Sequence, residues 1–237
     1  MLPDEAVAVQ ESLRTRLVIP PPGFAVPPTV VGLDVTYTES SFGVAAAVVI
    51  DVATLAVVEA VTAQGEVSFP YVPGLLAFRE IPLLREAISR LSATPALLIC
   101  DGYGLAHPRR FGLASHLGVL LDVPAFGIAK TPYVGAWAPV DEPRGSWSDL
   151  VDGDEIVGRA VRTQTGVKPV FVSAGHRIAL DDCTSLAVRL SGRYRIPEPT
   201  RQADILSRRR LADHLSAGGA EWQHGGHGGQ PAAGGSR

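Results

Sequence analysis

The sequence predicts an α/β fold with one mixed sheet flanked by helices, and two observations support this. Three apolar, strand-like runs at residues 29–37, 42–51 and 55–64 are joined by links too short for a crossover, so they are expected to form an antiparallel meander. Two further apolar runs, 96–100 and 124–129, enclose a segment with helical spacing, which is typical of a parallel βαβ unit. Antiparallel strands are therefore expected to continue into parallel ones within a single sheet.

Two helices are expected around the meander. Residues 4–17 have amphipathic spacing and lack the basic start and apolar core of a signal peptide. The proline-rich stretch that follows cannot be helix interior. Residues 74–91 place apolar side chains from Leu75 to Ile88 at helical spacing. Pro82 falls inside this segment and is expected to kink the helix or to start a second one.

The second half of the chain is expected to add a helix at 111–121, strands at 155–163 and 168–173, and a helix at 180–190. Residues 133–154 are rich in turn-forming residues and are expected to be an irregular surface excursion.

The chain is expected to end in a segment without fixed structure. After Leu215 the sequence is rich in glycine and lacks apolar periodicity, so residues 216–237 are expected to be a disordered tail. Residues 1–215 are then expected to form one domain, which suits their length.

Composition limits the class of protein. The chain has 237 residues and is 46% hydrophobic, yet no apolar run approaches the twenty or so residues of a membrane span. With no signal peptide, it is expected to be a cytoplasmic protein without a membrane partner. Cys100 and Cys183 are too few for a disulfide framework and are expected to be buried thiols.

Charge is unevenly distributed along the chain. The net charge of −3 argues against a protein that coats nucleic acid nonspecifically. Residues 189–210, however, carry seven arginines against two acidic residues. This local excess suits either contact with phosphates or a solvated helix end.

Carboxylates interrupt otherwise apolar elements. Asp34 is the only charged residue in the first strand of the meander, Asp101 ends the strand that opens the βαβ unit, and Glu80 lies near Pro82. Such groups are costly to bury unless they are paired, hydrogen-bonded or bound to a metal. Taken singly, each residue also suits a purely structural role. Asp34 suits pairing with a buried arginine, Asp101 suits capping of the next turn, and Glu80 suits capping of a helix. Together they suggest a divalent-metal site for phosphoryl transfer.

Several ordered motifs run through the chain: VVGLDVTY, FPYVPGLLAFRE, DGYGLAHPRRFGLASHLG, VPAFGIAK, and GHRIAL followed by YRIPEPTRQAD. They resemble the motifs of the endonuclease V family, and the resemblance extends from about Asp4 to Arg208. It implies a ribonuclease H-like fold, with residues 1–215 as a single catalytic domain that acts as a monomer.

The resemblance also implies an activity. Members of the family are DNA repair enzymes that require Mg²⁺, with Mn²⁺ as a substitute, and recognise deoxyinosine (hypoxanthine) in single- or double-stranded DNA. They hydrolyse the second phosphodiester bond 3′ to the lesion, which leaves a 3′-OH and a 5′-phosphate. The same activity is expected of this chain.

Catalytic roles follow from the matched positions. By resemblance Asp34 and Asp101 bind the metal, Glu80 is a third acidic catalytic residue, and Lys130 supports catalysis from the end of an apolar strand. Some members have a histidine three residues after the PEPTR motif, and here that position is Asp204. An aspartate there can bind a metal or polarise a water, but it cannot act as a neutral imidazole base.

Substrate contacts are assigned in the same way. Tyr71 lies between two prolines that stiffen its loop. It matches the family's wedge residue, which intrudes between bases; a tyrosine packed in the core is the alternative. Backbone amides can donate to O6 of hypoxanthine but not to the amino group of adenine. The base pocket is expected to be lined by Gly74, Leu76, Gly102, Gly112 and Leu113, with His107 touching the substrate. Arg109 and Arg110 are expected to contact phosphates.

Two other functions fit the same motifs. The motifs do not show whether a 2′-OH is tolerated, so an inosine-specific endoribonuclease acting on RNA is one alternative. The other is a module that binds inosine without cutting, although such a module has no need of the three acidic residues.

Overall fold

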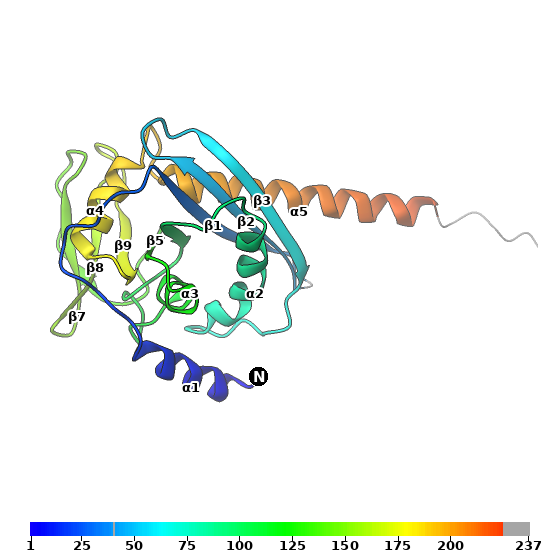
Figure 1. Ribbon diagram of the computed structural model, residues 1–237, viewed down its shortest axis with the longest axis horizontal. Helices are drawn as coiled ribbons and strands as arrows, with labels where there is room; N and C mark the ends of the chain where they lie inside the picture. Colours follow the sequence, from blue (N-terminus) through cyan, green and yellow to red (C-terminus); the bar gives the residue numbers. More distant parts are fainter. Residues whose placement is uncertain (40, 225–237) are drawn as a thin grey trace, which may run out of the picture.

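A mixed sheet runs through the molecule and carries helices on both faces (Figure 1). The computed structural model describes residues 1–39 and 41–224. Within these residues the sheet has nine strands in the order β3-β2-β1-β4-β5-β9-β8-β7-β6. The strands are β1 Thr29–Tyr37, β2 Phe42–Asp51, β3 Val57–Glu66, β4 Leu98–Asp101, β5 Ala125–Ala129, β6 Ala136–Trp137, β7 Trp147–Asp152, β8 Glu155–Val161 and β9 Val170–His176.

The antiparallel meander and the parallel strands meet at β1. β1 pairs antiparallel with β2 and parallel with β4, which in turn pairs parallel with β5. This confirms the predicted mixed sheet. Leu33 lies opposite Cys100 in the register of β1 and β4. The next residues, Asp34 and Asp101, are therefore at the same level of the sheet.

Alternating side chains divide the apolar residues between two cores, one on each face of the sheet. The helices are α1 Pro3–Arg14, α2 Leu76–Ser89, α3 Leu113–Leu121, α4 Leu180–Arg189 and α5 Glu198–His224. Val30 and Val31 are neighbours on β1, but Val30 packs in the core with α4 and α5, whereas Val31 packs in the core with α2 and α3. The sheet is thus buried between two helical layers.

Two boundaries near the meander differ from the expectations. β3 begins at Val57 and not at residue 55, because the Asp51 side chain accepts the amide hydrogens of Ala53 and Thr54 and holds a turn there. Pro82 does not start a separate helix, since α2 continues through it. The proline lacks the amide hydrogen that would otherwise bond to the carbonyl one turn earlier.

The segment 133–154 was expected to be irregular, and this is wrong in part. It contains β6 and β7, and β7 pairs antiparallel with β8. Leu150 is the only buried residue of β7, so the apolar alternation that identifies a strand is missing from this stretch.

The C-terminal helix extends beyond the expected end of the domain. Leu211 is buried, whereas residues 212–217 are exposed. α5 continues to His224 and so includes the beginning of the predicted tail (Figure 1). Residues 225–237, the rest of that tail, lie outside the described residues.

Two expectations from composition can also be compared with the structure. Cys100 and Cys183 are buried and unpaired, as predicted. In the described part of the chain, no helix has the length and apolar character needed to cross a membrane.

Candidate active site

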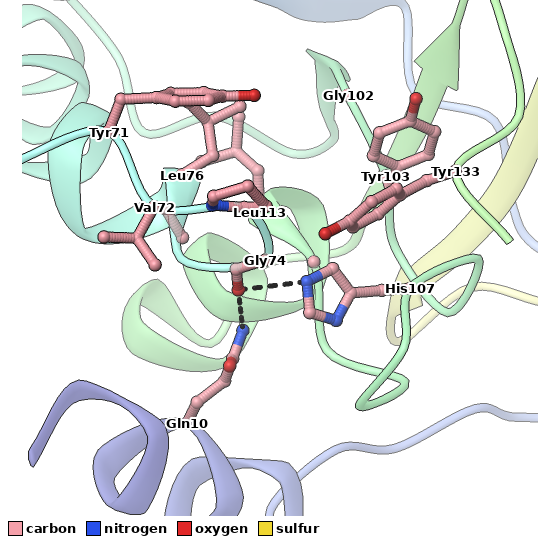
Figure 2. Close-up of a pocket in the computed structure, with 13 residues that line it drawn as sticks. Gln10, Tyr71, Val72, Gly74, Leu76, Gly102, Tyr103, His107, Leu113 and Tyr133 are labelled. Atoms are coloured by element: carbon pink, nitrogen blue, oxygen red, sulfur yellow. Dashed lines mark hydrogen bonds between the residues drawn. The ribbon is translucent and has the colours of Figure 1, made fainter. Parts of the chain in front are cut away.

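A cavity of about 150 Å³ opens where the chain leaves β4 (Figure 2). The residues that the sequence assigned to the wedge and the base pocket all line it: Tyr71, Gly74, Leu76, Gly102, His107, Gly112 and Leu113. The sequence did not indicate the other lining residues, which are Gln10, Val72, Pro73, Ala77, Tyr103 and Tyr133. The expected pocket residues are therefore brought together, and α1 also contributes to the wall.

The carbonyl oxygen of Gly74 is held from three sides in this cavity. It lies 3.2 Å from Gln10 Nε2, 2.7 Å from Arg109 Nη2 and 3.1 Å from His107 Nε2. Gln10 also donates to the carbonyl of Phe111 at 2.6 Å and accepts from Arg109 Nε at 2.5 Å. Gly74 has a φ of +81°, a backbone conformation that favours glycine. The floor of the pocket is thus fixed by contacts between distant parts of the chain.

Both ring nitrogens of His107 are engaged within the protein. Nδ1 accepts from the amide of Arg109 at 3.2 Å, so Nε2 is the nitrogen that donates to Gly74 O. Burial and, to a smaller extent, the charge of Arg109 lower the pKa of His107 to about 4. The ring is therefore neutral near pH 7. It forms a wall of the pocket and meets the ring of Tyr133 edge-on at 5.7 Å.

The two arginines that were expected to contact phosphates, Arg109 and Arg110, bond to other parts of the protein. Arg109 bonds to Gln10 and to Gly74 O. Arg110 forms ion pairs with Asp152 at 2.8 Å and with Glu155 at 2.6 Å. The sequence could not reveal these partners, since each lies far away along the chain.

Tyr71 and His116, two further ring residues near the cavity, differ in exposure. Tyr71 is 70% exposed at the lip of the cavity, so it is not packed in the core. Its place in a stiff loop suits a side chain that intrudes between bases. His116, by contrast, is buried between Phe78 and Phe111 and does not line this cavity.

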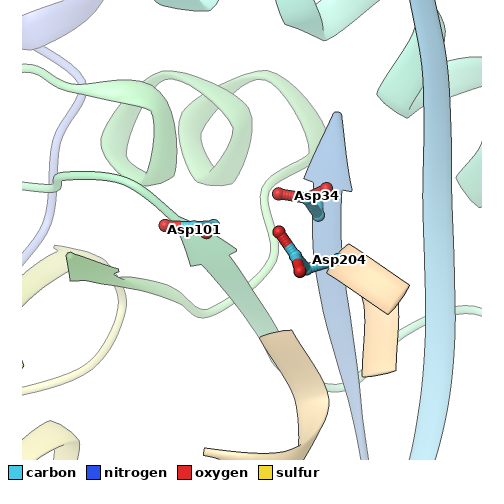
Figure 3. Close-up of side chains that lie close together, drawn as sticks. All are labelled: Asp34, Asp101 and Asp204. Atoms are coloured by element: carbon cyan, nitrogen blue, oxygen red, sulfur yellow. The ribbon is translucent and has the colours of Figure 1, made fainter. Parts of the chain in front are cut away.

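Three carboxylates converge beside this pocket (Figure 3). Asp34 comes from β1, Asp101 from the end of β4 and Asp204 from α5. One carboxylate oxygen of each lies within 4.8 Å of the others. Asp34 and Asp101 were predicted as metal ligands, and the structure adds Asp204 to the same group.

The position of Asp204 depends on how α5 packs against β1. The helix begins where a Cβ on Gly32 would lie 2.0 Å from Pro199 O, so only glycine on β1 allows this close approach. Two turns further, Ser207 Oγ donates to Asp34 Oδ2 at 2.6 Å and lies 2.7 Å from Thr36 Oγ1. These contacts hold α5 against the strand and aim Asp204 at the cluster.

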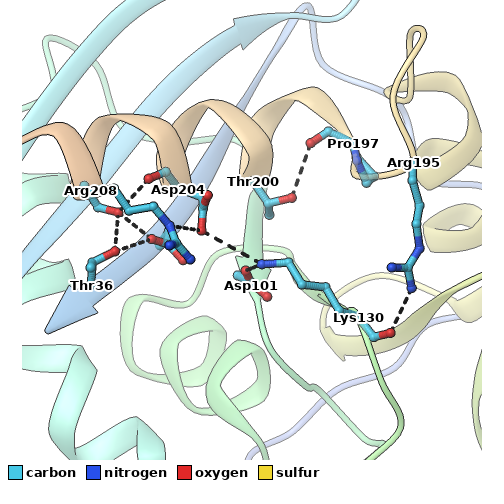
Figure 4. Close-up of polar contacts among 10 residues, drawn as sticks. Thr36, Asp101, Lys130, Arg195, Pro197, Thr200, Asp204 and Arg208 are labelled. Atoms are coloured by element: carbon cyan, nitrogen blue, oxygen red, sulfur yellow. Dashed lines mark hydrogen bonds and ion pairs between the residues drawn. The ribbon is translucent and has the colours of Figure 1, made fainter.

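Burial and nearby negative charges shift the pKa of Asp34. Burial raises the pKa of Asp34 to about 6; the Ser207 hydrogen bond opposes this rise, while Asp101 and Asp204 add to it. Lys130 Nζ lies 3.1 Å from Asp101 Oδ2 and 3.9 Å from Asp204 Oδ1 (Figure 4). Burial alone would lower the pKa of Lys130, but the neighbouring aspartates outweigh it and leave that pKa raised.

Glu80 lies behind the three aspartates and not among them. It is a buried residue inside α2, so it does not cap a helix. Burial, followed by the charges of Asp34 and Asp101, raises its pKa well above the usual range. The nearby Tyr37 hydroxyl opposes this rise. Without a metal, the charged form of Glu80 is therefore disfavoured at this position.

The other structural roles considered for the aspartates are not observed. Asp34 bonds to hydroxyl groups and not to a buried arginine, and Asp101 pairs with Lys130. The donor set fits a hard divalent cation, which prefers carboxylate oxygens. A cation at this point would offset the repulsion among the three carboxylates.

Comparison with known proteins yields a consistent match. The family model of Endonuclease V matches residues 11–205. A curated Endonuclease V of Streptomyces avermitilis is 55% identical over 215 residues, covering 89% of this chain and 93% of that protein. The Endonuclease V of Nocardia farcinica is 51% identical over 209 residues, covering 88% of this chain and 92% of that protein.

Solved structures agree with the sequence matches. The crystal structure of the Streptomyces avermitilis protein superposes with a TM-score of 0.86 at 55% identity, covering 90% of this chain and 95% of that one. Another similar structure is a variant of Ciona intestinalis Endonuclease V in complex with a 23mer DNA containing an inosine followed by a ribo-adenosine. It superposes with a TM-score of 0.79 at 30% identity, covering 89% of this chain and 97% of that one. These neighbours share the ribonuclease H-like fold that the sequence predicted for this chain.

Proposed function

The chain belongs to the endonuclease V family, and from this premise we propose that it is a DNA repair endonuclease that recognises deoxyinosine. It hydrolyses the second phosphodiester bond 3′ to the lesion and leaves a 3′-OH and a 5′-phosphate. One observation carries the proposal: Asp101 belongs to the carboxylate cluster, and the next residue, Gly102, lines the pocket. A base held in the pocket therefore keeps its own backbone phosphates near the carboxylates.

The proposed cofactor is Mg²⁺, with Mn²⁺ as a substitute, held by Asp34, Asp101 and Asp204. When bound, it would supply positive charge to the reacting phosphate and make a water molecule more acidic. Lys130, beside Asp101 and Asp204, neutralises charge at the rim of the site. Glu80 is buried next to the cluster with a raised pKa, and its proposed role is to exchange a proton with the site.

The pocket supports selection of hypoxanthine by its backbone. The amide N–H groups of Gly74, Leu76 and Leu113 donate to no acceptor among the described residues, and all three residues line the pocket. Such donors can bond to O6 of hypoxanthine, whereas the amino group of adenine would leave them unpaired. Tyr71, exposed at the lip, is positioned to fill the space that a flipped base leaves in the stack.

Residues from one chain supply both the pocket and the carboxylates, which supports a monomeric enzyme with residues 1–215 as its catalytic domain. An inosine-specific endoribonuclease is the second candidate. It is favoured by the Ciona intestinalis complexes, in which the DNA carries a ribo-adenosine after the inosine. A module that only binds inosine is less well supported, because it does not require the cluster of three aspartates.

The position of the cut tests the proposal. A duplex with a single deoxyinosine, labelled at the 5′ end of that strand, is incubated with the protein and Mg²⁺, and the product is sized against a ladder. We expect one nick, one nucleotide beyond the lesion, and none in a matched duplex with deoxyadenosine. An inosine-containing RNA is included: cleavage of RNA alone supports the endoribonuclease, and binding without cleavage supports the binding module.

A further inference from the structure

Three consecutive arginines follow Ser207 on α5, and they differ in what they contact. Arg208 Nε donates to Asp204 Oδ1 at 3.0 Å. Arg210 has Asp213 within 3.9 Å, and Arg209 has no ion pair or hydrogen bond among the described residues. Successive residues on a helix point about 100° apart, so a run of three covers most of its circumference. Only Arg208 faces the carboxylate cluster.

Arg208 uses only one of its donor atoms for Asp204. Its two terminal nitrogens make no hydrogen bond with the described residues, and its side chain is 66% exposed. Figure 4 shows Arg208 from α5 and Lys130 from the end of β5 reaching the same aspartate. The guanidinium group is thus held at the rim of the site with unused donors open to solvent.

The backbone beneath Arg208 is firmly anchored. The preceding residue, Ser207, is fully buried and bonds to Asp34, and Leu211, one turn later, is buried as well. A cation on such an anchored turn loses less conformational freedom on binding than one on a loop. Its planar fork of donors also suits the oxygens of a phosphate.

We propose that Arg208 is a phosphate-binding residue that contacts the backbone phosphate next to the one that is cut. The inference rests on the proposed function, because it assumes that the substrate strand crosses the carboxylate cluster. The three aspartates would by themselves repel that strand, and a cation at the rim counters the repulsion. A phosphate contact reads no base, so its contribution should be the same with or without deoxyinosine.

The test is a salt titration of DNA binding in EDTA, where cleavage cannot proceed by the proposed metal route. Two duplexes are used that differ only in one deoxyinosine or deoxyadenosine. For Arg208→Ala we expect the slope of log affinity against log salt concentration to fall by about 1 on both duplexes. Affinity at low salt should fall about ten- to hundredfold. Arg209→Ala is the matched control, and it should keep the slope of the parent protein.

A further variant separates charge from geometry. Arg208→Lys should keep most of the slope of log affinity against log salt concentration, because that slope depends on the number of phosphates neutralised by positive charges. It should still bind more weakly than the parent, because lysine lacks the planar fork of donors. Equal losses in Arg208→Ala and Arg209→Ala would overturn the proposal. So would an unchanged slope in Arg208→Ala with a lower unfolding temperature, since the ion pair with Asp204 would then only stabilise the helix.

Failure of the proposed function would look different from failure of this inference. In that case the parent protein would bind the two duplexes equally well. Arg208→Ala would still lose slope on both of them, because the phosphate contact does not depend on the lesion.

Discussion

Ser207 Oγ lies 2.6 Å from Asp34 Oδ2, and this hydrogen bond joins α5 to β1 inside the carboxylate cluster. Ser207 is fully buried, and its hydroxyl also lies 3.1 Å from the carbonyl of Asp204. The bond lowers the pKa of Asp34 and so opposes the effect of burial, which raises that pKa to about 6. One serine thus influences both the charge of the first aspartate and the position of the last.

Replacement of this serine should shift the pH dependence of nicking. In Ser207→Ala the carboxylate loses a donor, so the pKa of Asp34 should rise further and the acidic limb of the rate profile should move to higher pH. Ser216→Ala is the matched control, because Ser216 is an exposed serine of the same helix that bonds only to the carbonyl of Ala212. Superimposable acidic limbs in the parent and Ser207→Ala would contradict this role.

The raised pKa of Asp34 should also be visible in stability. A free aspartate titrates near pH 4, whereas Asp34 in the folded protein titrates at about 6. Between these values only the folded state keeps the proton, so without metal the stability of the folded state should fall as the pH rises from about 4 to about 6. Asp34→Asn lacks this titration. Its free energy of unfolding should exceed that of the parent by about 2–3 kcal/mol at pH 7.5, but not at pH 4.

Thermal or urea unfolding in EDTA measures this difference between the two proteins. Added Mg²⁺ should stabilise the parent more than Asp34→Asn, since the metal needs the charged carboxylate. Parallel stability curves for both proteins across this pH range would show that Asp34 is not the titrating group.

Glu80 should matter for catalysis and not for folding. Burial raises its pKa well above the usual range, so the amide of Glu80→Gln closely resembles its protonated form. Stability should stay equal or increase, while nicking should fall by about a hundredfold or more. Glu86→Gln, an exposed residue of the same helix paired with Arg90, is the control. Full activity in Glu80→Gln would remove Glu80 from the catalytic set.

Gly74 should be required for selection of the base. An alanine there adopts a φ of +81°, and its Cβ lies 2.8 Å from Arg109 Nη2, so the floor of the pocket must shift. Gly145 has a similar φ of +92° but no neighbour within 4 Å, which makes Gly145→Ala a control for backbone strain alone. Each variant should lose about 1 kcal/mol or more of stability. Only Gly74→Ala should lose about ten- to hundredfold in preference for deoxyinosine over deoxyadenosine. A competition assay between the two duplexes measures this ratio, and equal losses in both variants would contradict the assignment.

The sequence predicted the residues whose surroundings made them unusual. Asp34 and Asp101 stand out because they are charges in apolar strands, and the parallel register of β1 and β4 places them at one level. The pocket residues stand out because glycines and prolines cluster in motifs that resemble those of a known family. In each case the signal lies within a short stretch of chain.

Residues that act across long distances in the sequence were not predicted. Ser207 and Asp34 are separated by 173 positions, and Gln10 and Phe111 by 101. A serine in a helix or a glutamine in an N-terminal segment looks like any solvated polar residue until the fold supplies its partner. The partners of Arg109 were not predicted for the same reason, because they lie on the pocket floor and on α1.

The most direct test of the account is the dependence of nicking on Mg²⁺ in the parent and in Asp101→Asn. With a deoxyinosine duplex in single turnover, the rate of the parent should rise with Mg²⁺ and saturate, vanish in EDTA, and return when Mg²⁺ is restored. Asp101→Asn should still bind the duplex but cut it at least a hundredfold more slowly. Undiminished cleavage in EDTA, or by Asp101→Asn, would contradict a catalytic metal held by these aspartates.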